Sequence, residues 1–125
     1  MLVGRPATPV ELDTIDLEWG TVGADLARQL VELGHREVLL LGAPEVAHEM
    51  GMTYAVRFRD GVRNVLAGAG VTLVELPTDV DFATTLDSIV ATLVAHPGIT
   101  GVIVQHESAA PPLLAAAGAL RLRIP

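Results

Sequence analysis

The segment 22–42 constrains the fold more than any other part of this 125-residue chain. Its first half carries large apolar residues at helical spacing on one stripe: Val22, Leu26, Leu30 and Leu33. Gly34 follows at the position where a residue in the left-handed conformation ends a helix at the lowest cost. The apolar run Val38-Leu39-Leu40-Leu41-Gly42 comes almost at once and is typical of a buried strand. The sequence therefore predicts a helix that turns directly into a buried parallel strand.

Strand and helix patterns alternate along the whole chain. Strands are expected near 14–17, 38–42, 72–76 and 101–105, and helices near 20–33, 53–69, 81–95 and 109–120. Alternation of this kind predicts an α/β fold with three layers, a parallel sheet flanked by helices, in a Rossmann-like arrangement. No repeat, low-complexity tract or linker interrupts the pattern, so a single unit over 1–125 is expected.

Composition excludes several classes of function. The chain has no cysteine, so it has no disulfide, no thiolate zinc site and no cysteine nucleophile. Its net charge is −7, and its eight cationic side chains are scattered arginines, so the chain alone is not expected to bind DNA. The longest apolar run, 109–120, is shorter than the ~20 residues of a spanning helix, and no signal peptide is recognised at the start. A soluble protein is expected.

The loops that leave the predicted strands differ from the turns that enter them. The entering turns are short and built from helix breakers: Gly34-His35-Arg36, Ala69-Gly70 and His96-Pro97-Gly98. The leaving segments, 43–52, 77–82 and 106–108, are longer or richer in polar side chains. Open parallel sheets bind ligands beyond the carboxyl ends of their strands, so a binding site is expected at this edge of the sheet.

Three motifs that suggest chemistry fail on inspection. Gly42-Ala43-Pro44 lacks the repeated glycines and the lysine of a phosphate loop. His106-Glu107-Ser108 has the residue types of a hydrolytic triad, but neighbours in sequence cannot stack as nucleophile, base and orienting acid. His48-Glu49 lacks the second histidine of a helical zinc motif. No catalytic residue, cofactor or metal is therefore expected.

The remaining polar and aromatic candidates have two interpretations each. Phe82 fits the apolar face of its helix, yet it directly follows a polar loop, where a ring could stack on a ligand. Arg57 and Arg59 lie in the first turns of a helix and form either a solvated face or a ligand clamp. Glu107 is either a capping acid or a ligand contact. The residues alone leave these alternatives open.

Several short motifs occur in the order found in one family of bacterial transcription regulators. They are Val3-Gly4-Arg5-Pro6, Thr14 to Trp19, Leu33-Gly34-His35-Arg36, Asp81-Phe82, Gln105-His106-Glu107-Ser108 and Leu122-Arg123-Ile124-Pro125. Nearly the whole chain resembles the carboxyl-terminal, effector-binding lobe of the lactose-repressor (LacI/GalR) family. That resemblance implies one lobe of a periplasmic-binding-protein type I fold.

The resemblance also assigns expected roles to particular residues. Phe82 would stack on a ring of the effector, and Glu107 would accept hydrogen bonds from sugar hydroxyl groups. His106 would add a second polar contact. Asp16, Glu18 or Trp19 would approach from the crossover between lobes.

One position departs from the pattern of the family. The family usually places an effector-binding arginine three residues before the glycine that corresponds to Gly61, and this chain has Phe58 there. Arg57 or Arg59 is expected to substitute for it.

The resemblance further implies a non-catalytic module of a cytoplasmic, dimeric regulator that binds a sugar or a related small polar molecule. The headpiece that contacts DNA, most of the other lobe and the strands after Pro125 have no counterpart in this chain. Half of a cleft should bind sugar weakly. The alternatives are half of a periplasmic sugar receptor, or a small α/β enzyme with Glu107 as its base and His106 nearby.

Overall fold

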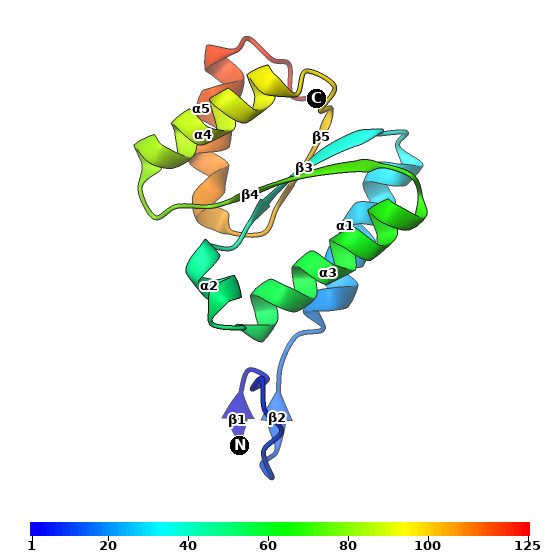
Figure 1. Cartoon of the computed structure of the whole chain (residues 1–125), viewed down its shortest axis with the longest axis vertical. Helices are drawn as coiled ribbons and strands as arrows, with labels where there is room; N and C mark the ends of the chain where they lie inside the picture. The colour runs from blue at the N-terminus through cyan, green and yellow to red at the C-terminus, as the bar shows by residue number, and fades with distance from the viewer.

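The computed structural model describes all residues, 1–125, and its centre is a three-stranded parallel sheet (Figure 1). The strands are β3 (Glu37–Gly42), β4 (Thr72–Pro77) and β5 (Gly101–Val104), in the spatial order β4-β3-β5. Val38 of the central strand lies opposite Leu73 on one side and Gly101 on the other. The central strand is the apolar run recognised in the sequence, because only that strand is covered on both faces and both edges.

Helices cover both faces of the sheet (Figure 1). On one face lie α1 (Trp19–Glu32) and α3 (Thr53–Gly68), and on the other lie α4 (Phe82–Ala95) and α5 (Ala110–Ala119). Side chains of β3 alternate between two cores, since Val38 and Leu40 join the α1–α3 side whereas Leu39 and Leu41 join the α4–α5 side. The prediction of a three-layer α/β fold is confirmed.

The apolar stripe predicted for α1 is wrong about the buried face of that helix. Val22, Leu26 and Leu33 are exposed, whereas Gly23, Ala24 and Ala27 are buried. The cause is the close approach of α3: a Cβ added at Gly23 would overlap the backbone carbonyl of Phe58. Only small residues fit between the two helices at this contact. Of the predicted stripe, Leu30 alone packs against the core, whereas the other three residues are exposed.

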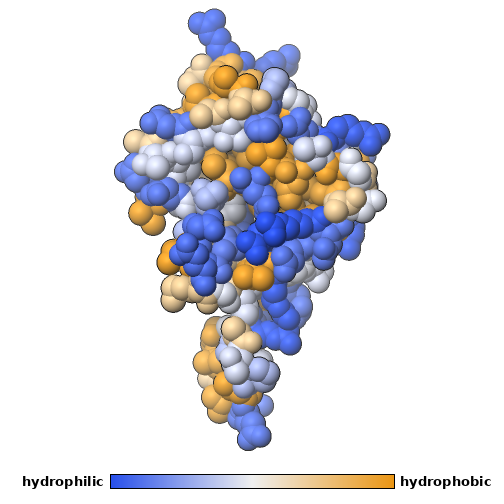
Figure 2. Space-filling model, in the orientation of Figure 1, coloured by the Kyte–Doolittle hydropathy of each residue, from blue (hydrophilic) through white to orange (hydrophobic).

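The segment before α1 forms a separate small unit. The strand expected near 14–17 is only β2 (Thr14–Ile15), and it pairs in parallel with β1 (Leu2–Val3) instead of joining the main sheet. Figure 2 shows this unit as a narrow projection below the main body. Two short helices complete the chain, α2 (Glu45–Glu49) after β3 and the 3-10 helix η1 (Glu107–Ala109) after β5. No helix has the length and apolar character needed to cross a membrane.

Candidate functional site

The loops that leave the three strands of the main sheet lie at one edge, and a single glutamine ties two of them together. The side-chain Oε1 of Gln105 accepts a hydrogen bond from the backbone N–H of Ala43 at 3.1 Å, and its Nε2 donates to the carbonyl of Tyr54 at 3.3 Å. These two hydrogen bonds hold the ends of β5 and β3 and the start of α3 together. The prediction did not include Gln105 among the site residues.

Phe82 is the first residue of α4 and faces outward at this edge. Half of its surface (50%) is exposed, and it belongs to neither of the two large cores. Asp81 fixes the start of the helix, since its Oδ2 accepts hydrogen bonds from the backbone N–H and the hydroxyl of Thr84, each at 2.8 Å. These two bonds, the backbone N–H bond first, lower the pKa of Asp81. An aromatic ring on a capped helix start is a rigid, partly exposed surface.

His106 and Glu107 follow β5 at the same edge. Glu107 is the first residue of η1 and is exposed, while Nδ1 of His106 lies 2.9 Å from the hydroxyl oxygen of Ser108. The helix α4, which begins at Phe82, packs against η1. The carboxylate of Glu107 can therefore offer acceptor positions to a ligand at this edge.

Asp16, Glu18 and Trp19 form a second group at the crossover from β2 into α1. Asp16 accepts hydrogen bonds from the indole N–H of Trp19 at 3.2 Å and from the backbone N–H of Arg5 at 3.0 Å. Trp19 meets Tyr54 edge to face, with ring centroids 6.4 Å apart. Asp16 thus braces the crossover, and its two oxygen atoms are engaged within the chain.

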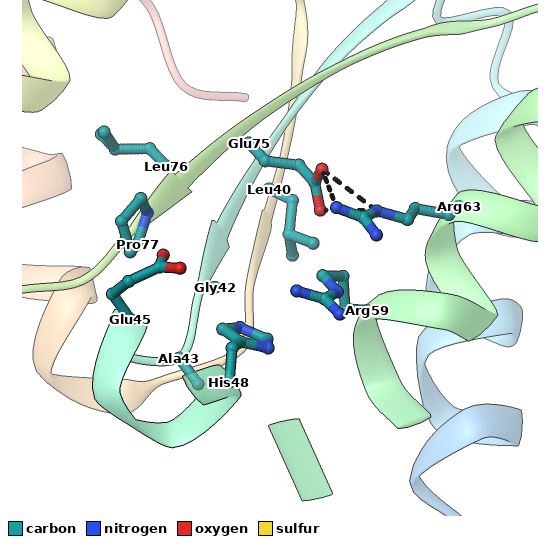
Figure 3. Close-up of a pocket in the computed structure, with 10 residues that line it drawn as sticks. All are labelled: Leu40, Gly42, Ala43, Glu45, His48, Arg59, Arg63, Glu75, Leu76 and Pro77. Carbon is teal, nitrogen blue, oxygen red and sulfur yellow. Dashed lines mark hydrogen bonds and ion pairs between the residues drawn. The ribbon is translucent and has the colours of Figure 1, made fainter. Parts of the chain in front are cut away.

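Arg57 belongs to this crossover group, whereas Arg59 does not. Nη1 of Arg57 lies 4.0 Å from a carboxylate oxygen of Glu18. Arg59 instead lines a cavity of about 200 Å³ between α2, α3 and the ends of β3 and β4 (Figure 3). Two residues apart on a helix means roughly 200° of rotation at 3.6 residues per turn, so the two arginines serve different surfaces.

Sequence reasoning missed the other ionisable residues of this cavity. They are Glu45, His48, Arg63 and Glu75. Arg63 and Glu75 form a two-pronged pair, with Nε–Oε1 at 3.0 Å and Nη2–Oε2 at 2.7 Å. The i, i+4 spacing of Arg59 and Arg63 and the single acid in the apolar strand β4 are the sequence signals that could have indicated this group.

Two side chains that line the cavity each have a buried nitrogen without a hydrogen-bond partner, Nδ1 of His48 and Nε of Arg59. Burial is the main cause that lowers the pKa of His48, and the positive charge of Arg59 adds to it, against the opposing charges of Glu45 and Glu75. Figure 2 shows a band of strongly hydrophilic side chains that crosses the molecule between α2 and α3. The arrangement leaves hydrogen-bonding capacity for a ligand.

Comparison with solved structures finds this fold in transcriptional regulators and in a substrate-binding protein of a sugar transport system. A LacI family transcriptional regulator from Bifidobacterium animalis superposes with a TM-score of 0.83 at 16% identity, over 98% of this chain and 44% of that one. A complex of the transcriptional regulator CelR with cellobiose gives 0.79 at 21% identity, over 98% and 38%. A substrate-binding protein of a sugar ABC transport system from Bordetella parapertussis gives 0.76 at 14% identity, over 95% and 37%.

The chain spans less than half the length of each of these three proteins. At such low identity the likeness shows the fold, and it confirms the fold that the resemblance implied. The proteins compared are regulators and binding proteins. No curated protein sequence matches the chain.

A family model tests the sequence directly. The model of the periplasmic binding protein-like domain matches residues 27–125, which is most of the chain and includes the whole main sheet. The three-layer fold and this match agree. The chain therefore belongs to the periplasmic binding protein-like domain family.

Proposed function

We propose that residues 1–125 form the effector-binding lobe of a LacI-type transcription regulator and that the lobe binds a sugar or a related small polar molecule without performing chemistry. The family match and the regulators among the solved structures support this proposal. One of those regulators is a complex with cellobiose, so a sugar is the first class of ligand to test.

The exposed ring of Phe82 is the observation that carries the proposal. A phenylalanine left half exposed (50%) costs apolar stabilisation unless something else covers the ring. The apolar face of a sugar can cover it, as the resemblance implies. Glu107, the first residue of the 3-10 helix that packs against α4, and His106 just before it supply polar contacts.

The crossover group would contact the effector from the side on which a second lobe would lie. Glu18, Trp19 and Arg57 lie around the entry to α1, and Asp16 holds Trp19 in place. In a longer protein these residues would face the opposing lobe, and effector binding would then bias how the two lobes are oriented. We place such a protein in the cytoplasm as a homodimer that contacts DNA only through a separate headpiece.

The test is a titration of the 125-residue chain with cellobiose and other neutral sugars, followed by two-dimensional ¹H–¹⁵N nuclear magnetic resonance. We expect saturable shifts at Phe82, His106 and Glu107 with dissociation constants in the millimolar range, because half of a cleft lacks the opposing contacts. Phe82→Ala should weaken this binding at least tenfold.

The matched control is Val80→Ala, since Val80 is 95% exposed in the same loop and contributes no stacking surface. Equal binding by wild type and Phe82→Ala would remove Phe82 from the site. Sub-millimolar binding in calorimetry would show that the lobe does not need its partner lobe.

A periplasmic sugar receptor is the second candidate. It is favoured by the structural likeness to a sugar ABC transport protein and to a fructose-binding periplasmic domain. Translation of the source gene on both sides of this segment separates the two. An in-frame helix-turn-helix upstream would support the regulator, whereas an in-frame signal peptide would support the receptor.

A further inference from the structure

The cavity beside Arg59 is too small for a whole disaccharide but large enough for one substituent of a ligand. Its volume is about 200 Å³, below the roughly 300–1,000 Å³ of typical ligand pockets. It opens at the carboxyl edge of the sheet, since Gly42 and Pro77, the last residues of β3 and β4, are part of its wall. It therefore lies on the same side of the sheet as the loops of the proposed effector site.

The two arginines of the cavity differ in how well they are paired. Arg63 is neutralised by its two-pronged bond to Glu75. Arg59 has only Asp60, whose Oδ1 lies 3.8 Å from Nε and whose side chain is 54% exposed. The guanidinium of Arg59 is permanently charged, and its buried Nε has no hydrogen-bond partner. Its positive charge is thus available to a ligand.

His48 stands next to this charge; its Nδ1 is buried without a hydrogen-bond partner, and its Nε2 lies near Gly42 in the cavity wall, 4.0 Å from where a Cβ on that residue would be. Figure 3 shows the ring of His48 between the guanidinium of Arg59 and the carboxylate of Glu45, which lies on the opposite wall. Apart from Glu75, whose carboxylate is paired with Arg63 on the arginine side, donors therefore gather on one side of the cavity and an acceptor on the other. The lowered pKa of His48 means that the ring is mostly neutral near pH 7 without a ligand, so it can donate one N–H without adding a second fixed charge.

This polarity selects the class of ligand. A metal ion would be repelled by Arg59, and a neutral sugar would offer the guanidinium only neutral acceptors, which form bonds roughly half as strong as charged ones. A ligand with an oxyanion at one end and hydroxyl groups beside it matches both walls, because the hydroxyl groups can donate to Glu45.

We propose that this cavity binds the oxyanion group of a carboxylated or phosphorylated sugar, with Arg59 and His48 as donors and Glu45 as the acceptor for a neighbouring hydroxyl group. The proposal rests on the proposed function for the sugar part of the ligand. It goes further in assigning a charged effector and a subsite that lies apart from Phe82 and Glu107.

The experiment compares four probes with the 125-residue chain: D-glucose, D-glucuronate, D-glucose 6-phosphate and inorganic phosphate. Resonances of the His48 ring and of the Arg59 Nε–H report on the cavity, and the backbone amides of Phe82 and Glu107 report on the proposed effector site. We expect D-glucuronate or D-glucose 6-phosphate to shift His48 and Arg59 saturably, with an affinity at least tenfold higher than that of D-glucose.

Variants then assign the effect to the cavity. Arg59→Gln and His48→Gln should each raise the dissociation constant for the oxyanion about tenfold, which corresponds to ~1.4 kcal/mol of binding free energy. Arg36→Gln is the matched control, because Arg36 is an exposed arginine before β3, at the opposite end of the strand. Well-dispersed spectra confirm that each variant is folded. Because two variants are used, the test still holds if one of them does not fold.

Each outcome decides a separate point. Equal shifts by D-glucose and by the charged sugars, or binding that survives in both variants, would overturn the oxyanion site. Inorganic phosphate that binds as tightly as D-glucose 6-phosphate would support the site with a free anion as its ligand, while tighter binding of the sugar phosphate would support an effector. Shifts confined to Phe82 and Glu107 overturn this proposal alone, and shifts confined to His48 and Arg59 overturn the effector site alone.

Discussion

Gly61 of α3 lies against the carbonyl oxygen of Gly20 in α1 so closely that a Cβ on Gly61 would overlap that oxygen. Gly23 meets the carbonyl of Phe58 in the same way. The two helices therefore cross backbone to backbone, and this contact places the start of α1, with Trp19, beside the start of α3, with its arginines. The crossover group depends on a contact that only glycine permits.

Gly61→Ala should therefore destabilise the chain by about 1–3 kcal/mol, because the added methyl group must push the helices apart. The measurement is the free energy of unfolding in urea. Gly68→Ala is the control in the same helix, since a Cβ there meets nothing within 4 Å. It should be neutral or slightly stabilising. Equal behaviour of the two variants would contradict the close contact.

Gln105→Ala tests the two side-chain hydrogen bonds by which Gln105 joins β5, β3 and α3. Ala43 is fully buried (0% exposed), so removal of the Gln105 side chain leaves its N–H without an acceptor. The expected loss is about 1–3 kcal/mol of unfolding free energy, the usual cost of a buried unsatisfied donor. Hydrogen exchange of the Ala43 amide should also accelerate.

Gln29→Ala supplies the reference for that variant, since Gln29 is exposed on α1. It should change the unfolding free energy by less than about 0.5 kcal/mol. If Gln105→Ala lowers the free energy of unfolding no more than Gln29→Ala does, the hydrogen bonds of Gln105 do not stabilise this edge of the sheet.

The strands of the main sheet were predictable because each is an apolar run bounded by helix breakers. The range 38–42 became Glu37–Gly42 and 72–76 became Thr72–Pro77. The helix α2 was not predicted, since five residues are too few to show a helical period. The buried face of α1 was wrong because a pattern of large apolar residues cannot register a contact made by Gly23.

The location of the site was easier to predict than its composition. The contrast between entering and leaving loops predicts a site at the carboxyl edge, and that prediction needs only the order of elements. The cavity beside Arg59 draws one histidine from α2, arginines from α3 and one acid from β4. No short stretch of sequence contains this group: the sequence signals are the i, i+4 pair Arg59 and Arg63 and the single acid of β4, and the packing of α2 and α3 against the sheet brings them together.

Phe82 and Ile89 lie on the same helix, and their truncation should destabilise the chain by very different amounts. Ile89 is fully buried (0% exposed) among the residues of the α4–α5 core, so Ile89→Ala should cost about 2–5 kcal/mol of unfolding free energy. Phe82→Ala should cost less than about 1 kcal/mol, because the ring is half exposed and outside that core. Thermal unfolding measures both. A comparable loss for Phe82→Ala would return this residue to the core.

His48 should make the stability of the chain depend on pH. Burial, reinforced by Arg59, lowers the pKa of His48 in the folded chain below its ordinary value of 6.5. As the pH falls through 6.5, the unfolded chain binds a proton that the folded chain does not yet bind, so the free energy of unfolding decreases until the folded-state pKa is also passed. Above 6.5 the ring is neutral in both states and this contribution is absent.

His48→Gln removes that contribution, and the difference between the variant and the wild type isolates it from the carboxylates that titrate in both proteins. Urea unfolding of the two proteins from about pH 8 to about pH 5 should show the variant gaining stability relative to the wild type as the pH falls. A difference that stays constant over this range would contradict the lowered pKa. If the cavity binds an oxyanion, the same experiment with saturating D-glucose 6-phosphate should reduce the pH dependence of the wild type, since the bound anion would stabilise a protonated His48 in the folded chain.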